Sequence, residues 1–276
     1  MRALLFSLAV LSGCGSAPPA ANNASLAQSR LAQAETRAAA QVKSGDYAAA
    51  ARQYAEAVRI ALTLENAEAI AANAINQSVV LQWLGRDADA RAALAPVLDN
   101  TRIAFSERRK IQAELRRAIL ELATGNTGAA AVWAGQAENR CAQSRCEYAA
   151  TLTNVRAQVE LDRGNAAEAA RLAQSVAGSG GAPRAEIANA LRTLGRAQQA
   201  QGQPAAALQP LRQALDIDRE LGDPRKILAD LSELARAAQG AGDAAAAGEY
   251  KERAQAVSRA MNEGRSVADM EALLRR

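Results

Sequence analysis

The chain has 276 residues, of which 49% are hydrophobic but only 3% aromatic, and alanine is the most frequent residue. It contains no histidine, which excludes histidine-based nucleophile triads, general bases and metal sites. The formal charge of +4 comes from 33 basic and 29 acidic residues without a concentrated basic run, and this argues against nucleic-acid binding. The composition favours helices that pack closely through small side chains.

The amino-terminal residues have the composition of an export signal. Arg2 provides a positive charge, and residues 3–11 form an apolar stretch that is too short to span a bilayer as a helix. The stretch runs into the tetrapeptide LSGC at 11–14, which resembles the lipobox of bacterial lipoproteins. The resemblance implies that residues 1–13 are a signal peptide and that Cys14 becomes the lipidated first residue. An ordinary signal peptide with a chance cysteine is the alternative.

Residues 14–25 are interpreted as the lipidated cysteine followed by a flexible linker, because they lack periodic apolar residues and include two consecutive prolines. Bacterial lipoproteins carry several acyl chains such as palmitate, and several chains anchor a protein stably where one does not. Residue 15 is glycine rather than aspartate, which resembles the signal for sorting to the outer membrane. The expected location is therefore the bacterial cell envelope, with the protein anchored in the outer membrane and facing the periplasm.

A short motif recurs six times along the remaining chain, each time as a glycine followed five residues later by an alanine. The glycines are about 40 residues apart, and such a regular period predicts a repeat architecture. Each glycine is expected at a turn between two helices, where a positive φ carries no steric cost. Each alanine is expected where two helices cross. The six glycines are Gly45, Gly85, Gly125, Gly164, Gly202 and Gly242.

Apolar residues with helical spacing lie on both sides of these glycines. The stretch 187–194 precedes Gly202, for example, and the stretch 208–215 follows it. The repeated unit is therefore an antiparallel helix pair, and adjacent pairs are expected to stack and bury a shared core. Helix-breaking linkers at 178–183 and 222–224 separate neighbouring pairs, the second with a proline at a helix start.

The repeated unit resembles the tetratricopeptide repeat. The resemblance extends over roughly residues 31–257 and implies an all-α fold: a right-handed superhelix, or solenoid, of about six helix pairs at 26–262 with a C-terminal capping helix. The period exceeds that of the family by about six residues, so longer helices or connections are expected. The best single match is 190–218, where the motif positions are held by Leu194, Gly195, Gly202, Ala207, Leu211 and Ala214.

The C-terminal segment 263–276 is predicted to form a separate capping helix or tail. Ser266 and Asp269 have the spacing of a capping box, which would open a short helix ending at Leu274. A terminal helix that covers the apolar face of the last repeat is what an open array requires.

Cys141 and Cys146 are the two remaining cysteines, and an oxidising compartment would favour a local disulfide between them. A redox pair is the alternative, although the spacing is not Cys-x-x-Cys. We expect no metal site, because two thiols without histidine provide too few ligands. We expect no cofactor and no catalytic activity, because the glycines follow the repeat instead of clustering in a phosphate-binding loop.

The family resemblance places the first helix of each pair on a concave groove, and it implies that a protein or peptide partner binds there. Aligned on the loop glycines, the groove positions change from apolar to polar along the chain. The apolar section comprises Ile75, Val79, Gln82, Leu115, Ile119 and Leu122. The polar section provides the candidate binding residues, which are Asn154, Gln158, Asn189, Arg192, Arg196 and Arg236, together with Ser232.

Asparagine side chains suit a peptide backbone, and two arginines one helical turn apart suit a carboxylate. The alternative is that the arginines are solvated or paired internally with Asp162, Asp230 or Glu233. Trp83 and Trp133 are interpreted as packing residues between helices rather than as platforms on which a ligand stacks.

Together these features predict a non-catalytic scaffold, tethered to the membrane in the periplasm, that binds a protein or peptide partner in its groove. The resemblance suggests envelope assembly, secretion, pilus or cell-wall machinery. One alternative is a protein that binds a small ligand or glycan, which the scarcity of aromatic residues disfavours. Another is a structural protein that assembles with itself, and the sequence specifies no oligomeric state.

Overall fold

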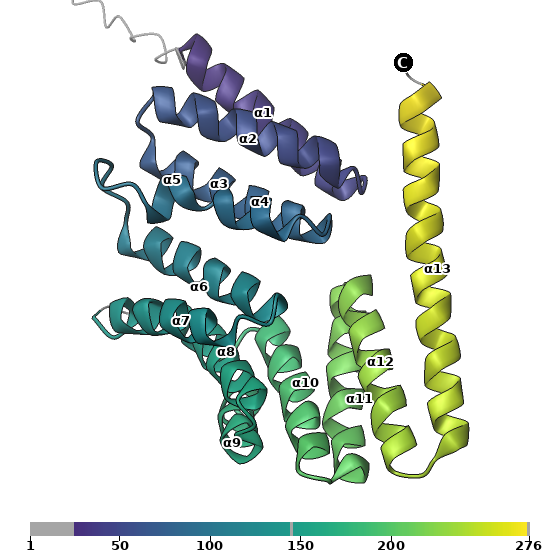
Figure 1. Ribbon diagram of the computed structural model, residues 1–276. Helices are drawn as coiled ribbons and strands as arrows, with labels where there is room; N and C mark the ends of the chain where they lie inside the picture. Colours follow the sequence, from purple (N-terminus) through teal and green to yellow (C-terminus); the bar gives the residue numbers. More distant parts are fainter. Residues whose placement is uncertain (1–24, 144–145, 275–276) are drawn as a thin grey trace, which may run out of the picture.

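The computed structural model describes residues 25–143 and 146–274 of the chain. In this part of the chain thirteen α-helices follow one another and no strand is present. The helices pack in sequence order as six hairpins, and the hairpins stack into an arc (Figure 1). The predicted all-α array of about six helix pairs is therefore confirmed.

The helices of the first three pairs are α1 (Leu26–Lys43) with α2 (Tyr47–Thr63), α3 (Ala67–Trp83) with α4 (Asp87–Ala92) and α5 (Ala95–Leu98), and α6 (Glu107–Ala123) with α7 (Thr127–Cys141). Those of the last three are α8 (Ala149–Asp162) with α9 (Ala166–Ala177), α10 (Arg184–Ala200) with α11 (Pro204–Leu221), and α12 (Pro224–Gly240) with α13 (Ala244–Leu274).

Several helix starts are fixed by side-chain caps. The side-chain oxygens of Ser25, Asp46, Asn66, Ser106 and Asp223 each accept a hydrogen bond from a backbone N–H in the first turn that follows. These N–H groups have no partner within the helix itself, so each cap defines where its helix begins.

The repeated glycine and alanine have the roles that their spacing predicts. All six turn glycines adopt a positive φ, between 72° and 86°, which is strained for any residue with a Cβ. The alanines five positions later are buried where the helices of a pair cross, and none is more than 3% exposed: Ala50, Ala90, Ala130, Ala169, Ala207 and Ala247.

The helices of the fifth pair approach each other unusually closely at Gly195. A Cβ atom added to Gly195 would lie 2.5 Å from Leu211 Cγ, so no other residue fits unless the Leu211 side chain or one of the two helices moves. The equivalent position on the other first helices holds another small residue, namely Ala38, Ser78, Ala118, Ala157 or Ala235, and each of these is buried.

The second pair is less regular than its sequence period suggests, because its second helix is divided into α4 and α5. Pro96 lies in the first turn of α5 and has no N–H to continue the hydrogen bonds of α4. A long connection over 99–106 follows, in which the Asn100 side chain accepts hydrogen bonds from the N–H groups of Arg102 and Ile103. Phe105 anchors this connection in the core.

The last helix, α13, is a single helix of 31 residues. The predicted start of a separate helix at Ser266 was therefore wrong, since that residue lies inside α13. No proline occurs between the last repeat and Ser266, and an isolated glycine such as Gly264 weakens a helix without ending it. None of the helices in the described ranges has both the length and the apolar composition that crossing a bilayer requires.

The curvature of the array follows from which helices touch. Successive first helices pack on one another: α3 on α6, α6 on α8, α8 on α10 and α10 on α12. The second helices in the described residues pack on first helices but not extensively on one another. Because the layer of first helices is the continuous one, it forms the inner side of the arc.

Candidate functional site

The apolar section of the predicted groove serves mainly to pack the inner helices. Leu115 is buried in the core, and Ile119 and Leu122 are half-buried against the same cluster. Ile75 contacts two apolar clusters, one around α1–α3 and one around α2–α4. These side chains therefore join neighbouring pairs, and only part of each reaches the inner surface.

The two candidate asparagines are bonded within the protein. Asn154 is buried on α8, and its Nδ2 donates to the backbone oxygen of Glu186 at 2.9 Å and to Glu186 Oε2 at 2.7 Å. The Oδ1 of Asn189 on α10 accepts hydrogen bonds from Arg192 and Lys226, each at 3.0 Å. Both amides therefore link α8, α10 and α12 to one another, and they are not presented to a peptide backbone.

Arg192 forms the centre of a buried charged cluster. Its Nε donates to Asp230 Oδ1 at 2.6 Å, its Nη2 contacts Asp218, and its side chain is only 11% exposed. Asp218 belongs to α11 and Asp230 to α12, so Arg192 connects three helices. The sequence left two interpretations of Arg192: binding of a partner's carboxylate, or solvation or pairing within the protein. The structure shows internal pairing with Asp230.

Burial sets the protonation behaviour of this cluster. Asp230 has no exposed surface, and desolvation raises the pKa of its carboxyl to about 6 against the opposing effect of Arg192. Desolvation also lowers the pKa of the Lys226 ammonium, and the nearby charge of Arg192 adds to this shift. The cluster is therefore a structural element that responds to pH.

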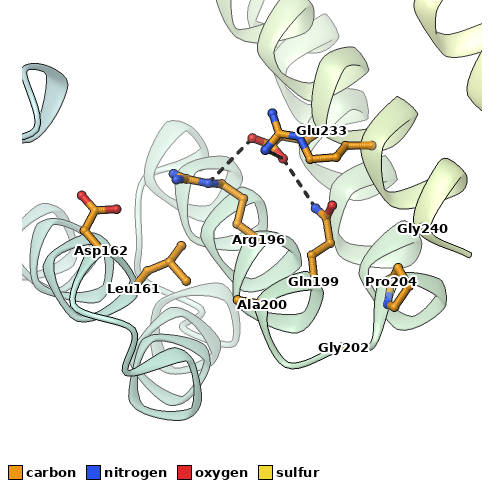
Figure 2. A pocket seen from close by; sticks show the side chains of 10 residues that line it. Leu161, Asp162, Arg196, Gln199, Ala200, Gly202, Pro204, Glu233 and Gly240 are labelled. Carbon is orange, nitrogen blue, oxygen red and sulfur yellow. Dashed lines mark hydrogen bonds and ion pairs between the residues drawn. The ribbon is translucent and has the colours of Figure 1, made fainter.

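The remaining candidates lie on the inner surface and are more accessible. Arg196 Nη1 donates to Gln158 Oε1 at 2.7 Å, and its Nε lies 3.7 Å from Glu233 Oε1. Arg236 Nη1 lies 3.2 Å from Glu233 Oε2, and the Gln199 amide approaches the same carboxylate (Figure 2). The Arg196 side chain is 35% exposed and that of Arg236 is 66% exposed.

A cavity of about 730 Å³ at the C-terminal ends of α8, α10 and α12 is lined by Arg196, Gln199, Glu233 and Arg236. Figure 2 shows Arg196 and Gln199 directed towards Glu233, with Leu161 and Asp162 on the other side of the cavity. The complete lining is Leu161, Asp162, Arg196, Gln199, Ala200, Gly202, Pro204, Glu233, Arg236 and Gly240. It offers guanidinium, amide and carboxylate groups without an aromatic ring.

Sequence reasoning missed Gln199 as a site residue and named Glu233 only as an internal partner. The signal for Gln199 was present, because it follows Arg196 by three residues and so lies on the same helical face. Ser232 is exposed on α12, near the cavity. Cys14 and the rest of residues 1–24 lie outside the described part of the chain.

Cys141 and Cys146 are joined by a disulfide, with their Cα atoms 5.0 Å apart. The bond closes the connection between α7 and α8, and both cysteines pack against the apolar cluster of α6–α8. It lies away from the cavity described above. Among the described side chains, at 25–143 and 146–261, no group of three acidic or cysteine residues is arranged to hold a metal ion.

Comparison with known proteins supports the repeat assignment in the second half of the chain. Residues 147–220, which span α8 to α11, match the tetratricopeptide repeat family. This segment is therefore similar to tetratricopeptide repeats, and the whole array has the architecture of a tetratricopeptide-type solenoid. Among curated proteins, none matches the sequence significantly.

Several solved structures are similar in fold. A Rap protein complexed with competence and sporulation factor is 15% identical, with a TM-score of 0.59, and the match covers 85% of this chain and 67% of that one. BtubC (BKLC) from P. vanneervenii is 18% identical over 86% and 93% of the two chains, with a TM-score of 0.49. At this identity the likeness to the Rap protein shows a common fold alone.

Proposed function

We propose that this protein is a non-catalytic scaffold that binds a protein or peptide partner along the inner surface of its helix array. The observation that carries the proposal is the cavity of about 730 Å³ on the inner helices, where Arg196 and Arg236 remain accessible. The similar Rap structure, complexed with competence and sporulation factor, gives fold-level support for binding by such an array.

The chemistry of the cavity favours an acidic segment of the partner. Arg196 and Arg236 share the carboxylate of Glu233, and the Arg196 contact is long at 3.7 Å. A carboxylate of the partner can bind the Arg196 guanidinium, which Glu233 holds only loosely, and the exposed guanidinium of Arg236. An arginine fork binds a carboxylate through two parallel hydrogen bonds. Gln199 would then bind the backbone of an extended partner through its amide.

We also propose that the protein is tethered to the bacterial cell envelope through lipid on Cys14, outside the cytoplasm. The tetrapeptide at 11–14 supports this location, and so does the Cys141–Cys146 disulfide, because disulfides persist in oxidising compartments. Labelled palmitate should be incorporated into the wild-type protein and not into Cys14→Ser. Equal labelling of the two proteins would contradict the lipid anchor.

The binding surface is tested with a photocrosslinking amino acid at position 199, introduced into the full chain in cells. The matched control is position 213, an exposed glutamine on the second helix α11. We expect a discrete partner from position 199 only, and at least a tenfold loss when Arg196→Ala and Arg236→Ala are combined, as for a lost ion pair of about 1.4 kcal/mol or more.

Two outcomes would contradict the proposed surface. The same products from positions 199 and 213 would mean that the inner surface has no selectivity, and crosslinks between copies of this chain alone would favour the self-assembling alternative. Arg192→Glu is unsuitable for this test, because Arg192 supports the core between α10, α11 and α12.

A further inference from the structure

Three side chains join the two ends of the array. Arg225 lies in the first turn of α12, and its guanidinium carbon lies 3.7 Å from the centre of the Trp83 ring at the end of α3. Trp83 meets Tyr47 edge-on, with ring centres 5.0 Å apart. Arg225 Nη1 lies 3.4 Å from the hydroxyl oxygen of Tyr47, a residue 178 positions earlier in the chain. We refer to Tyr47, Trp83 and Arg225 as the clasp.

The guanidinium of the clasp is held in place from its own side. The Asp223 carboxylate accepts hydrogen bonds from the backbone N–H groups of Arg225 and Lys226, which fixes the start of α12. The same carboxylate lies 3.7 Å from Arg225 Nε. Arg225 is therefore directed at the first two pairs from a rigid helix terminus, and it does not extend from a flexible loop.

A second observation shows that three segments converge at this point. A cavity of about 290 Å³ is lined by the turn between α1 and α2, by Pro224 and Arg225, and by Ala260 and Met261 of α13. Figure 1 shows α13 (yellow) rising from the lower edge of the arc towards the level of the first pairs (purple and blue). The sixth pair has thus returned to the beginning of the array.

The contact between the ends is narrow compared with the contacts between neighbouring pairs. Neighbouring pairs bury apolar clusters along whole helices, as between α2 and α3 or between α11 and α12. Among the described residues, the first-pair helices do not pack lengthwise on α12 or α13. Tyr47 and Trp83 are half-buried, and an arginine stacked on such a ring contributes about 1–2 kcal/mol, or roughly a tenfold change in an equilibrium constant. This closure can therefore be reversed without unfolding any helix pair.

We propose that the clasp is a latch that holds the array closed and opens to admit the partner to the inner surface. When Arg225 leaves Trp83 and Tyr47, the sixth pair separates from the first two, and an extended segment can enter from the side. The role in admission rests on the proposed scaffold function, whereas the closure itself is independent of it.

The closure is tested by small-angle X-ray scattering from Arg225→Ala. We expect the open population to rise about tenfold, seen as a larger radius of gyration and maximum dimension, with unchanged helical circular dichroism. The matched control is Arg253→Ala, because Arg253 lies 5.4 Å from the centre of the Tyr250 ring within the same helix, α13. This control should leave the dimensions unchanged.

Trp83 provides a local readout in a Trp133→Phe background, where it is the sole tryptophan. Arg225→Ala should change its emission by removing the stacked guanidinium, and Arg253→Ala should not. Unchanged dimensions in Arg225→Ala would overturn the latch, and so would a wild-type chain that is already extended in solution.

Crosslinking from position 199 separates the latch from the scaffold function. A severalfold higher partner yield in Arg225→Ala supports the latch. If Arg225→Ala expands the array but leaves the yield of partner crosslinks unchanged, the latch has no role in admitting the partner. The proposed scaffold function would then still stand. A loss of all partner crosslinks in both proteins would overturn the scaffold, and the scattering would still decide the closure.

Discussion

The first two pairs and the last two pairs are joined by different chemistry on their inner side. Between α1 and α3, the described residues form one side-chain hydrogen bond, from the buried Asn73 to the half-buried Glu35, beside a large apolar cluster. Between α10 and α12 the polar link is the cluster in which Arg192 is shared by Asp218 and Asp230. Apolar packing tolerates substitutions of similar volume, whereas a buried ion cluster depends on every member.

The largest expected effect comes from removing the centre of that cluster. Arg192→Met should lower the free energy of unfolding by about 3–5 kcal/mol, because two buried carboxylates lose their shared cation. Urea unfolding measures the change. Arg212→Met is the matched control, since Arg212 is exposed and bonds only the Tyr250 hydroxyl, and it should cost less than about 1 kcal/mol. Equal costs for the two variants would mean that the cluster adds no stability.

A smaller effect is expected where the fifth pair approaches most closely. Gly195→Ala should cost about 1–3 kcal/mol, because the new Cβ would overlap Leu211. Gly135→Ala on α7 has open space around it and should stabilise the protein by about 0.5–1 kcal/mol through higher helix propensity. Thermal unfolding of both variants tests the comparison, and a stabilising Gly195→Ala would show that α10 and α11 can move apart freely.

The disulfide lies at the junction of the two halves, and its removal should have a moderate effect. Replacing Cys141 and Cys146 together by serine should cost about 2 kcal/mol or less, because the loop they close is short. Unfolding with and without reductant gives the same information for the wild type. A much larger loss would indicate that the bond also holds α7 against α8.

The pH dependence of the free energy of unfolding tests one member of the ion cluster, Asp230. Because the folded pKa of Asp230 is raised to about 6, the stability associated with this carboxyl is present below its unfolded pKa and is lost as the pH rises through about 6. Asp230→Asn cannot lose a proton, so wild-type stability should fall relative to this variant between about pH 4 and 6. Parallel stability curves for the two proteins would contradict the raised pKa.

The fold was predictable because its repeated constraints are local. A positive φ requires glycine, and a close helix crossing requires alanine, so both recur with the period of the repeat. The division of the second pair into α4 and α5 at Pro96 was not predicted, and a proline alone does not decide it, because Pro210 lies inside the continuous helix α11. The continuation of α13 past Ser266 could not be predicted, because a capping pattern starts a new helix only where the preceding segment ends one.

The site was only partly predictable, because a helical position gives the direction of a side chain but not its partner. Arg192 and Arg196 are one turn apart and were assigned alike. They differ because Asp218 and Asp230 reach Arg192 from two other helices, whereas Arg196 has Glu233 at 3.7 Å and remains accessible. The clasp was missed for a similar reason, since it depends on the summed rotation of all six pairs.

The alanines at the helix crossings have a thermodynamic consequence. An alanine side chain has no rotamers to lose, so burying it costs no side-chain entropy on folding, unlike leucine or methionine. Each helix crossing therefore gains less free energy from burying apolar surface than a leucine would provide, and it also loses less side-chain entropy. This balance lets a chain with only 3% aromatic residues order six helix pairs.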